Sequence, residues 1–408
     1  MALALEGGTL IDGSGRDPAA GTRVVVEGER IVSVGGQRPR GGEPLEVTGL
    51  TVLPGLIDLH THMGILSVGD PEAMPPAVAA AHLFRNAELC LLSGHTTARE
   101  VAGADGGLRR AIDAGLLAGP RLFPSGPALC QSGGHGDLGP PFLPHHHDPG
   151  VPGLAQMSMV CDGPDGVRVA ARTAFRRGAT QLKVMISGGV VSLTDRIEDS
   201  QFTVEELHAA VQEARARDTY VTGHAHNVQS IRNGLEAGLE CFEHGTFLDE
   251  PTAAQMAAAG AALVPTLTTI RLLATEWQAW GVPEAVLPRV TGAEEAMREA
   301  VKIAYAAGVT VGSGTDILGP EQNRRGLEVA LKAEIVGPME AIVSATATSA
   351  RILRRDHELG TVQAGKLADL IAVAGDPLAD PALFDDPDRV ALVIQGGRVV
   401  KDTRSQAA

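Results

Sequence analysis

The sequence predicts an α/β protein that consists of a (β/α)8 barrel and a small β-sandwich domain built from both chain ends. Eight apolar runs alternate with helical segments in the middle of the chain, and short β-rich runs with glycine turns occur near both termini. A chain of 408 residues is longer than one compact core usually supports, which favours one large and one smaller domain. An open doubly wound sheet is the alternative. No G-x-G-x-x-G motif follows an early strand, which counts against a dinucleotide-binding version of that fold.

The two chain ends share one hairpin pattern. Residues 22–36 (TRVVVEGERIVSVGG) alternate in polarity around a short turn, and residues 389–403 (RVALVIQGGRVVKDT) are short β-rich runs around a Gly-Gly turn. We therefore expect residues 1–55 and 358–408 to form one composite β-sandwich domain and residues 56–357 to form the barrel.

The middle of the chain carries the strands expected of the barrel, as apolar runs separated by Ala-rich amphipathic segments. One such segment, residues 203–218, begins with Thr203 and has Glu206 three positions later, which is the pattern of a capping box. The predicted strands are 53–60, 96–102, 121–126, 181–187, 220–226, 239–245, 262–268 and 310–316.

The composition excludes several classes of partner. Aromatic residues make up 3% of the chain and the net charge is −15, so we expect neither a nucleic-acid partner nor a membrane partner. The four cysteines are widely scattered, which is typical of free thiols in a reducing compartment. The N-terminus does not resemble a signal peptide, and a cytoplasmic location is therefore expected.

The first apolar run ends in two histidines, His60 and His62, with one residue between them. Side chains two residues apart lie on the same face of a strand, so both imidazoles could reach one metal ion. Polar capping of a buried strand where it meets water is the alternative. The H-x-H spacing alone does not decide between the two.

Polar side chains also occur within or at the end of four later runs. Catalytic groups of a barrel lie at the carboxyl ends of its strands, and a buried polar group is costly unless it is paired or binds metal. Taken singly, a histidine could be a satisfied core residue, the lysine could extend to solvent and the aspartate could cap a helix. Their joint occurrence predicts a metal site. The residues are Lys183, His224, His244 and Asp316.

Several motifs resemble those of the amidohydrolase superfamily, over nearly the whole chain. They are PGLIDLHTH, GATQLKVMISGGV, VTGHAH, ECFEHG and GSGTD, and GTVQAGKLADLIAV resembles the family's small β-sandwich segment. Within the superfamily, SGGHGD (132–137) and the stretches after GATQLKVMISGGV and GSGTD are similar to prolidase-type Xaa-Pro dipeptidases and ochratoxin-hydrolysing amidases.

The resemblance implies a site with two divalent metal ions, most often zinc. In it His60, His62 and Asp316 would bind one ion, and His224 and His244 the other. Lys183 would bridge the ions after CO2 has carboxylated it to a carbamate. An ammonium group cannot bind a cation, whereas carbamate oxygen, carboxylate oxygen and neutral imidazole suit zinc.

The implied mechanism is attack on the substrate carbonyl by a hydroxide that bridges the two ions. Asp316 would carry the proton to the leaving amine. His135 is expected to hydrogen-bond the developing oxyanion or a substrate carboxylate, and with His226 and Arg196 to contact the substrate.

Two departures from the relatives leave the substrate open. His226 stands where many prolidase-like relatives carry Tyr, and EQNRRG (321–326) stands where relatives are often rich in His. The run HHH at 145–147 is interpreted as part of a loop near the mouth of the pocket.

The sequence thus predicts a binuclear metallo-amidohydrolase that cleaves a C–N bond of dipeptides or N-acyl amino acids. Ochratoxin-like amides, carbamates and ureas are alternative substrates. A mononuclear deaminase generally lacks the bridging lysine and has a glutamate near the histidine of the fifth strand, which GHAHNVQ does not offer. A non-catalytic scaffold would tend to lose metal ligands, and none is missing. A homo-oligomer is left open.

Overall fold

The computed structural model describes residues 2–37, 42–66, 75–138, 151, 153–192, 195–280, 284–319 and 322–406. They form a mixed α/β fold with two compact units. The first unit contains Met1–Asp58, Glu88–Thr97 and Asn323–Ala408, and the second contains Leu59–Ala87 and Ala98–Gln322. None of the described helices combines the length and the apolar character that a membrane crossing requires.

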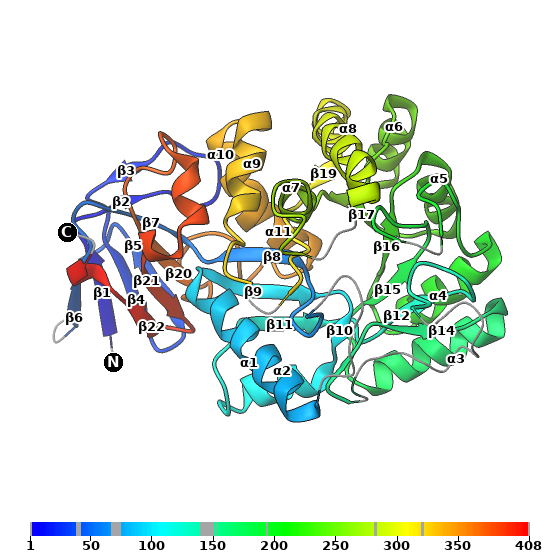
Figure 1. Cartoon of the computed structure of the whole chain (residues 1–408). Helices are drawn as coiled ribbons and strands as arrows, with labels where there is room; N and C mark the ends of the chain where they lie inside the picture. The colour runs from blue at the N-terminus through cyan, green and yellow to red at the C-terminus, as the bar shows by residue number, and fades with distance from the viewer. Residues whose placement is uncertain are drawn as a thin grey trace. The chain divides into compact units, whose positions relative to one another are not determined.

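The first unit holds two sheets and both chain ends (Figure 1). One sheet has the order β5-β4-β1-β6, with β1 (Ala2–Glu6), β4 (Val24–Glu27), β5 (Arg30–Val34) and β6 (Glu43–Glu46). The other has the order β22-β21-β20-β7-β2-β3, with β2 (Thr9–Leu10), β3 (Ala19–Ala20), β7 (Leu50–Pro54), β20 (Leu370–Ala374), β21 (Val390–Gln395) and β22 (Arg398–Asp402).

The two hairpins predicted at the chain ends are confirmed. β4 pairs with β5 and β21 pairs with β22, both antiparallel. β20 also pairs with β7, which places Ile371 opposite Leu53 and joins the N-terminal and C-terminal segments in one sheet. Buried aliphatic side chains such as Leu5, Val52 and Leu392 form the core of this unit.

The second unit contains a seven-stranded sheet in which all neighbouring strands are parallel. Its order is β14-β12-β15-β16-β17-β18-β19, with β12 (Ala128–Cys130), β14 (Ser158–Val160), β15 (Leu182–Met185), β16 (Val221–Ala225), β17 (Cys241–His244), β18 (Ala262–Val264) and β19 (Thr310–Val311). Two smaller sheets are β11-β9-β8, with β8 (Leu56–Thr61), β9 (His95–Glu100) and β11 (Arg121–Pro124), and β10-β13, with β10 (Gly103–Ala104) and β13 (Ala155–Gln156).

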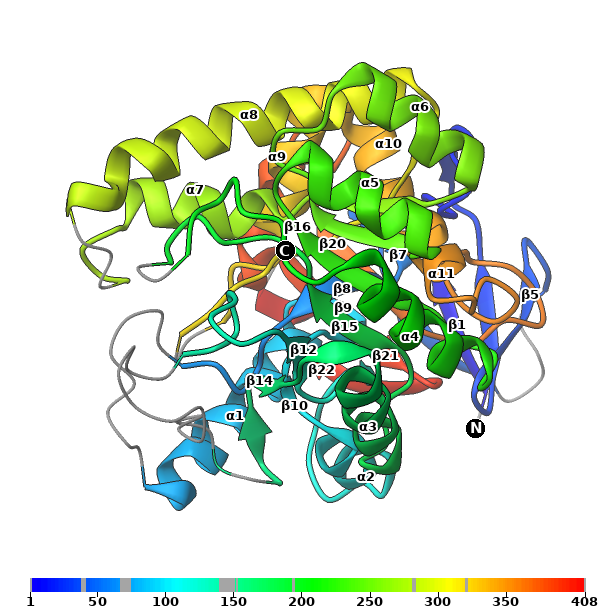
Figure 2. The same ribbon diagram turned by 90° about the vertical axis from the view of Figure 1, so that its right-hand side faces the viewer.

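Helices follow most of the parallel strands, and α3 to α6 lie outside β15 and β16 in Figure 2. The helix predicted over 203–218 is α4, and its capping box between Thr203 and Glu206 is confirmed. The helices are α1 (Pro76–Leu92), α2 (Gly106–Asp113), α3 (Gly163–Arg176), α4 (Val204–Arg215), α5 (Val228–Ala237), α6 (Glu250–Ala259), α7 (Leu267–Thr275), α8 (Leu287–Ala306), α9 (Leu327–Val336), α10 (Pro338–Val343) and α11 (Ser349–Ile352). Shorter helical turns are Glu284–Val286, Ser344–Thr348, Pro381–Asp385, Pro387–Arg389 and Arg404–Gln406.

Backbone hydrogen bonds connect the seven-stranded sheet with the β11-β9-β8 sheet. The Leu59 N–H donates to the Ser313 carbonyl over 2.8 Å, and the Asp316 N–H donates to the His60 carbonyl over 2.8 Å. At another edge the Thr180 N–H donates to the Pro124 carbonyl over 2.7 Å. These bonds bring the end of β8 beside the segment that follows β19.

The last predicted strand is shorter than expected. Residues 310–316 were expected to form a strand, but β19 ends at Val311. Asp316 has a φ of 56°, a left-handed conformation that cannot continue an extended strand. The regular strand therefore cannot include Asp316, although Gly312, Ser313 and Asp316 still form backbone hydrogen bonds with neighbouring segments.

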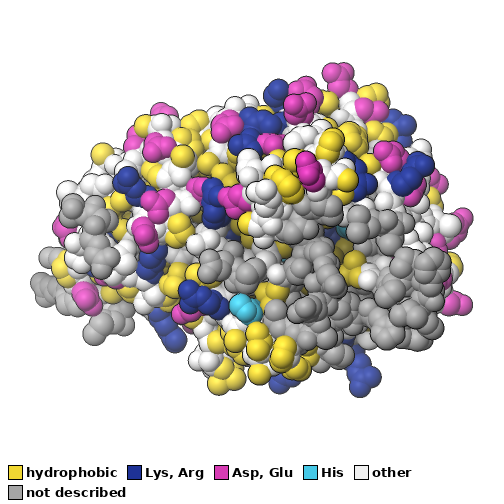
Figure 3. Space-filling view, viewed as in Figure 1, with side chains coloured by type: hydrophobic (Ala, Val, Ile, Leu, Met, Phe, Trp, Pro, Cys, Tyr) yellow, Lys and Arg dark blue, Asp and Glu magenta, His cyan; other side chains and the backbone are white. Residues whose placement is uncertain are grey.

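Charged side chains of both signs are interspersed over the coloured part of the face in Figure 3.

Candidate metal centre

One cavity in the second unit, with a volume of about 720 Å³ that includes space open to solvent, brings the predicted metal ligands together. All six of them line it, although they come from segments between β8 and the residues after β19. His135 and His226 line it as well. The six are His60, His62, Lys183, His224, His244 and Asp316.

The first cluster consists of His60, His62 and Asp316. The Nε2 atoms of the two histidines lie 3.1 Å apart, and Asp316 Oδ1 lies 3.4 Å from His60 Nε2 and 3.1 Å from His62 Nε2. Both Nδ1 atoms face acceptors outside the cluster. His60 Nδ1 lies 2.8 Å from Glu243 Oε2, and His62 Nδ1 lies 3.0 Å from the Ala102 carbonyl oxygen. With the protons on Nδ1, both Nε2 lone pairs point at the carboxylate, as in histidines that bind metal.

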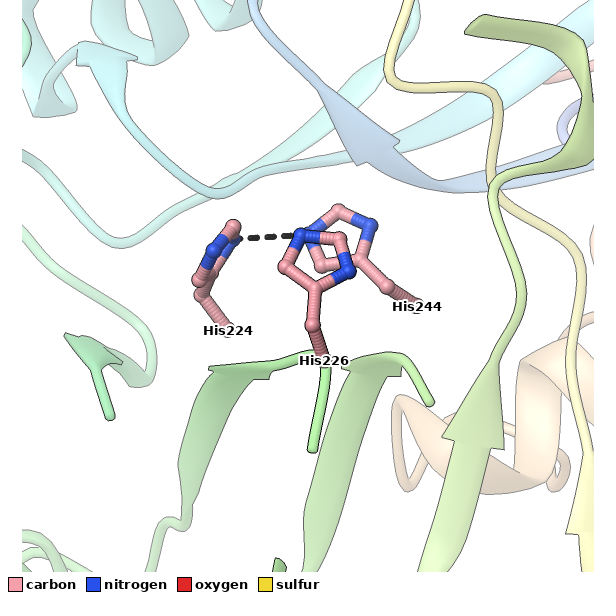
Figure 4. A group of neighbouring side chains, drawn as sticks. All are labelled: His224, His226 and His244. Atoms are coloured by element: carbon pink, nitrogen blue, oxygen red, sulfur yellow. Dashed lines mark hydrogen bonds between the residues drawn. The ribbon is translucent and has the colours of Figure 1, made fainter. Parts of the chain in front are cut away.

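The second cluster consists of His224, His226 and His244, whose rings converge beyond the ends of the strands (Figure 4). His244 Nε2 lies 2.9 Å from His224 Nδ1, and the outer His244 Nδ1 lies 2.7 Å from Thr266 Oγ1. Burial and the neighbouring histidines hold the pKa values of His224 and His244 well below the usual value. Their rings are therefore neutral, which is the form of imidazole that binds metal.

Lys183 is buried in β15 and lines the same cavity. Burial lowers the pKa of its amine to about 8, because the attraction of Glu243 and Asp316 only partly offsets the loss of hydration. A lowered pKa raises the share of neutral amine, which is the nucleophilic form of lysine. That form is the one that can react with CO2.

The backbone is strained at two of the candidate ligands. His244 has a φ of 69° and Asp316 a φ of 56°, in the left-handed region that residues other than glycine rarely adopt. Such strain tends to occur at functional sites, where the surrounding structure enforces it. Asp316 does not cap a helix, because the next described helix, α9, begins only at Leu327.

These donors fit two divalent metal ions. Each cluster offers buried imidazole nitrogens whose outer atoms are already hydrogen-bonded, and the first adds a carboxylate oxygen. Imidazole and carboxylate are the ligands that zinc prefers in hydrolytic sites.

A buried ion pair that contacts His60 of the first cluster was not predicted from the sequence. Glu243 accepts from Arg99 Nη2 over 2.6 Å, lies 2.8 Å from His60 Nδ1 and also accepts from the Thr222 hydroxyl. Burial alone would raise the pKa of Glu243, but Arg99 and His60 lower it to about 2. A permanently charged carboxylate therefore fixes the orientation of the His60 ring. The sequence signal that could have revealed this pair is a charged residue inside each of two apolar runs, Arg99 in 96–102 and Glu243 in 239–245.

Replacing Glu243 by glutamine is expected to weaken metal binding by about 10–100-fold, because His60 loses its charged partner. The affinity is measured by titrating the metal-free protein with zinc, after circular dichroism has confirmed that the variant is folded. The exposed Glu236→Gln on α5 is the matched control. Equal zinc affinity in Glu243→Gln and the parent would show that Glu243 does not orient a ligand.

His135, predicted to contact the substrate, stacks on His224 with the ring centroids 4.4 Å apart. Its Nδ1 lies 3.5 Å from Asp195 Oδ2, and its backbone N–H donates to Gln201 Oε1 over 3.0 Å. A Cβ atom at Gly189 would lie 2.0 Å from His135 Cε1, so only glycine allows this approach.

The remaining predicted positions differ in how close they lie to the cavity. His226 lines it, with Nδ1 at 2.6 Å from Thr246 Oγ1. Arg196 is not part of the described lining; its side chain is 74% exposed and lies 3.5 Å from Asp199 and 3.7 Å from Glu198. Gln322 belongs to the EQNRRG stretch that differs from the relatives, and it donates to the His62 carbonyl over 3.0 Å. The histidines at 145–147 lie outside the described residues.

Residues 51–400 match the amidohydrolase family. The chain belongs to this family. It is 32% identical over 420 residues to an ochratoxinase from Aspergillus niger, a match that covers 97% of the chain and 85% of that protein.

Solved structures of amidohydrolases are similar over nearly the whole chain. A prolidase complexed with N-methylphosphonate-L-proline is 36% identical with a TM-score of 0.92, covering 98% of this chain and 100% of that one. A Xaa-Pro dipeptidase with methionine bound in its active site is 31% identical with a TM-score of 0.88, covering 98% and 100%.

These similarities confirm the predicted superfamily and branch. They also confirm the predicted reaction class, metal-dependent hydrolysis of a C–N bond, and leave the substrate open.

Proposed function

We propose that this amidohydrolase uses two zinc ions to hydrolyse the amide bond of dipeptides or N-acyl amino acids. The observation that carries the proposal is the pair of ligand clusters that line one cavity together with a buried lysine. The prolidase and Xaa-Pro dipeptidase among the similar structures support a dipeptide substrate.

The ligand roles follow from the two clusters. His60, His62 and Asp316 would hold one ion, His224 and His244 the other, and Lys183 as a carbamate would be a ligand of both. Two bound ions supply an activated water and a polarised substrate carbonyl.

The proton and the substrate are handled by the chain's own groups. Asp316 would receive the proton of the attacking water on a carboxylate oxygen and pass it to the nitrogen of the leaving amine. His135, held between Asp195 and the His224 ring, would donate a hydrogen bond to a substrate oxygen, and His226 would make a second polar contact. The binding role of Arg196 stays a prediction.

The proposed architecture is a closed (β/α)8 barrel over 56–357 and a composite β-sandwich of 1–55 and 358–408. The backbone hydrogen bonds from Leu59 to Ser313 and from Thr180 to Pro124 support closure of the barrel. Pairing of β7 with β20 supports a composite terminal domain.

The ochratoxinase from A. niger favours a second candidate, hydrolysis of a non-peptide amide. Turnover of a substrate panel by the zinc-loaded protein separates the two. The panel contains Xaa-Pro and Xaa-Arg dipeptides, N-acyl amino acids, aryl amides and ochratoxin-like amides. The proposal expects the fastest turnover among dipeptides or N-acyl amino acids; release of ammonia from a deaminase substrate, or no turnover at all, would contradict it.

A further inference from the structure

Apart from the metal ligands, His135, His226 and two threonines, the described cavity wall is lined by apolar side chains. Ile270 and Leu273 come from α7, Met297 from α8, and Val190 from the loop after β15; all four are buried. Partly exposed apolar side chains continue the wall: Ile65, Met157, Val191 and Leu318.

The two threonine hydroxyls of this wall are already engaged. Thr266 Oγ1 lies 2.7 Å from His244 Nδ1, and the Thr269 hydroxyl donates to the Asp316 carbonyl over 2.5 Å. Both hydroxyl groups therefore bond to the candidate ligands.

Among the described lining residues of the cavity, Lys183 is the only lysine or arginine and Asp316 the only carboxylate. Besides them, the side chains that could pair with a charged group are the histidines, and α7 and α8 contribute no histidine to the wall. Two charged residues of the neighbouring helices, Arg271 on α7 and Glu294 on α8, pair with each other and are not part of the wall.

We propose that this wall selects substrates in which the group beside the scissile amide is uncharged and apolar. This inference rests on the proposed amide hydrolysis. An apolar group gains free energy when it leaves water for such a wall. A carboxylate or ammonium group placed against Ile270, Leu273 and Met297 would be buried beside side chains that offer it no charged partner, which is strongly unfavourable.

Substrates of equal size test the inference. The side chains of Met, Gln, Glu and Lys are compared in two series, N-acetyl-Xaa and Xaa-Pro, which place the side chain on either side of the bond. We expect kcat/KM for Met to exceed that for Glu and for Lys by more than about tenfold in at least one series. A ratio below tenfold in both series would overturn the proposal.

Binding is measured separately from turnover, by calorimetric titration of the zinc-loaded protein with the same compounds. If none of the compounds is hydrolysed, the proposed function fails. The inference is then decided by binding alone: the compounds with Met should bind more than about tenfold more tightly than those with Glu or Lys in at least one series. The two failures are thereby distinguished.

A variant of the wall provides a second test. Met297→Lys is expected to shift the Glu-to-Met ratio of kcat/KM, or of affinity, at least about tenfold towards Glu. If Met297→Lys does not fold, Leu273→Gln takes its place, and it should reduce the preference for Met over Gln. Val169→Lys is the control, because Val169 lies on α3 and is 64% exposed. An unchanged ratio in the folded wall variant would contradict the assignment.

Discussion

Lys183→Ala is expected to lose most amide hydrolysis and to bind fewer than two zinc ions per chain. The lysine is buried and lines the cavity with both ligand clusters, and its carbamate would be the only ligand from the chain that both ions share. Short carboxylic acids, such as formate and acetate, should restore part of the activity, because they supply the missing oxygen donor. Zinc content is measured by elemental analysis of the purified variant, and turnover with and without acetate.

Lys332→Ala is the matched control for this variant. Lys332 is also fully buried, and burial lowers its pKa to about 8, but it lies among Glu328 and Ser344 in the first unit. Its replacement should lower stability and leave the zinc content unchanged. A metal-loaded structure in which an unmodified Lys183 forms an ion pair away from the metal would refute the carbamate.

Asp316→Asn is expected to lower kcat by about 10²–10⁴-fold, while the variant stays folded and keeps most of its metal. Asparagine keeps the size of the side chain and one oxygen donor but cannot carry the proton. Substrates with better leaving groups should lose less, because they need less protonation of the nitrogen. The measurement is kcat for a series of anilides of graded leaving-group pKa.

Asp249→Asn is the control for a merely structural role. Asp249 is the N-cap of α6 and accepts from the Thr252 N–H over 2.8 Å. Asparagine caps helices as well as aspartate does, so this variant should keep its turnover. If Asp316→Asn behaves in the same way while it holds its metals, Asp316 is not the proton carrier.

The candidate ligands could be predicted because each is the wrong residue type for its place. His60 and His62 end a buried strand two residues apart, and Lys183 interrupts an apolar run. The periodicity of the helices and the turn residues of the terminal hairpins were likewise sufficient to predict α4 and the pairs β4–β5 and β21–β22.

The role of Glu243 could not be predicted because strand alternation misleads at this position. Glu243 and His244 are adjacent and should face opposite sides of the sheet. The left-handed backbone of His244 breaks the alternation, and Glu243 contacts His60 while His244 lines the cavity. A φ value is not visible in the sequence.

Two strands of the seven-stranded sheet were not predicted for another reason. β12 and β14 have three residues each, too few to produce a recognisable period. The contact of Arg196 with substrate stays a prediction; its guanidinium lies near the carboxylates of Glu198 and Asp199.

Zinc titration of the metal-free protein tests the binuclear site most directly. The protein is stripped with a chelator, and amide hydrolysis is measured as zinc is added in known ratios to the chain. The two clusters predict activity that rises until two equivalents are bound and then stays constant. Full activity at one equivalent, or hydrolysis that survives complete removal of metal, would contradict a binuclear amidohydrolase.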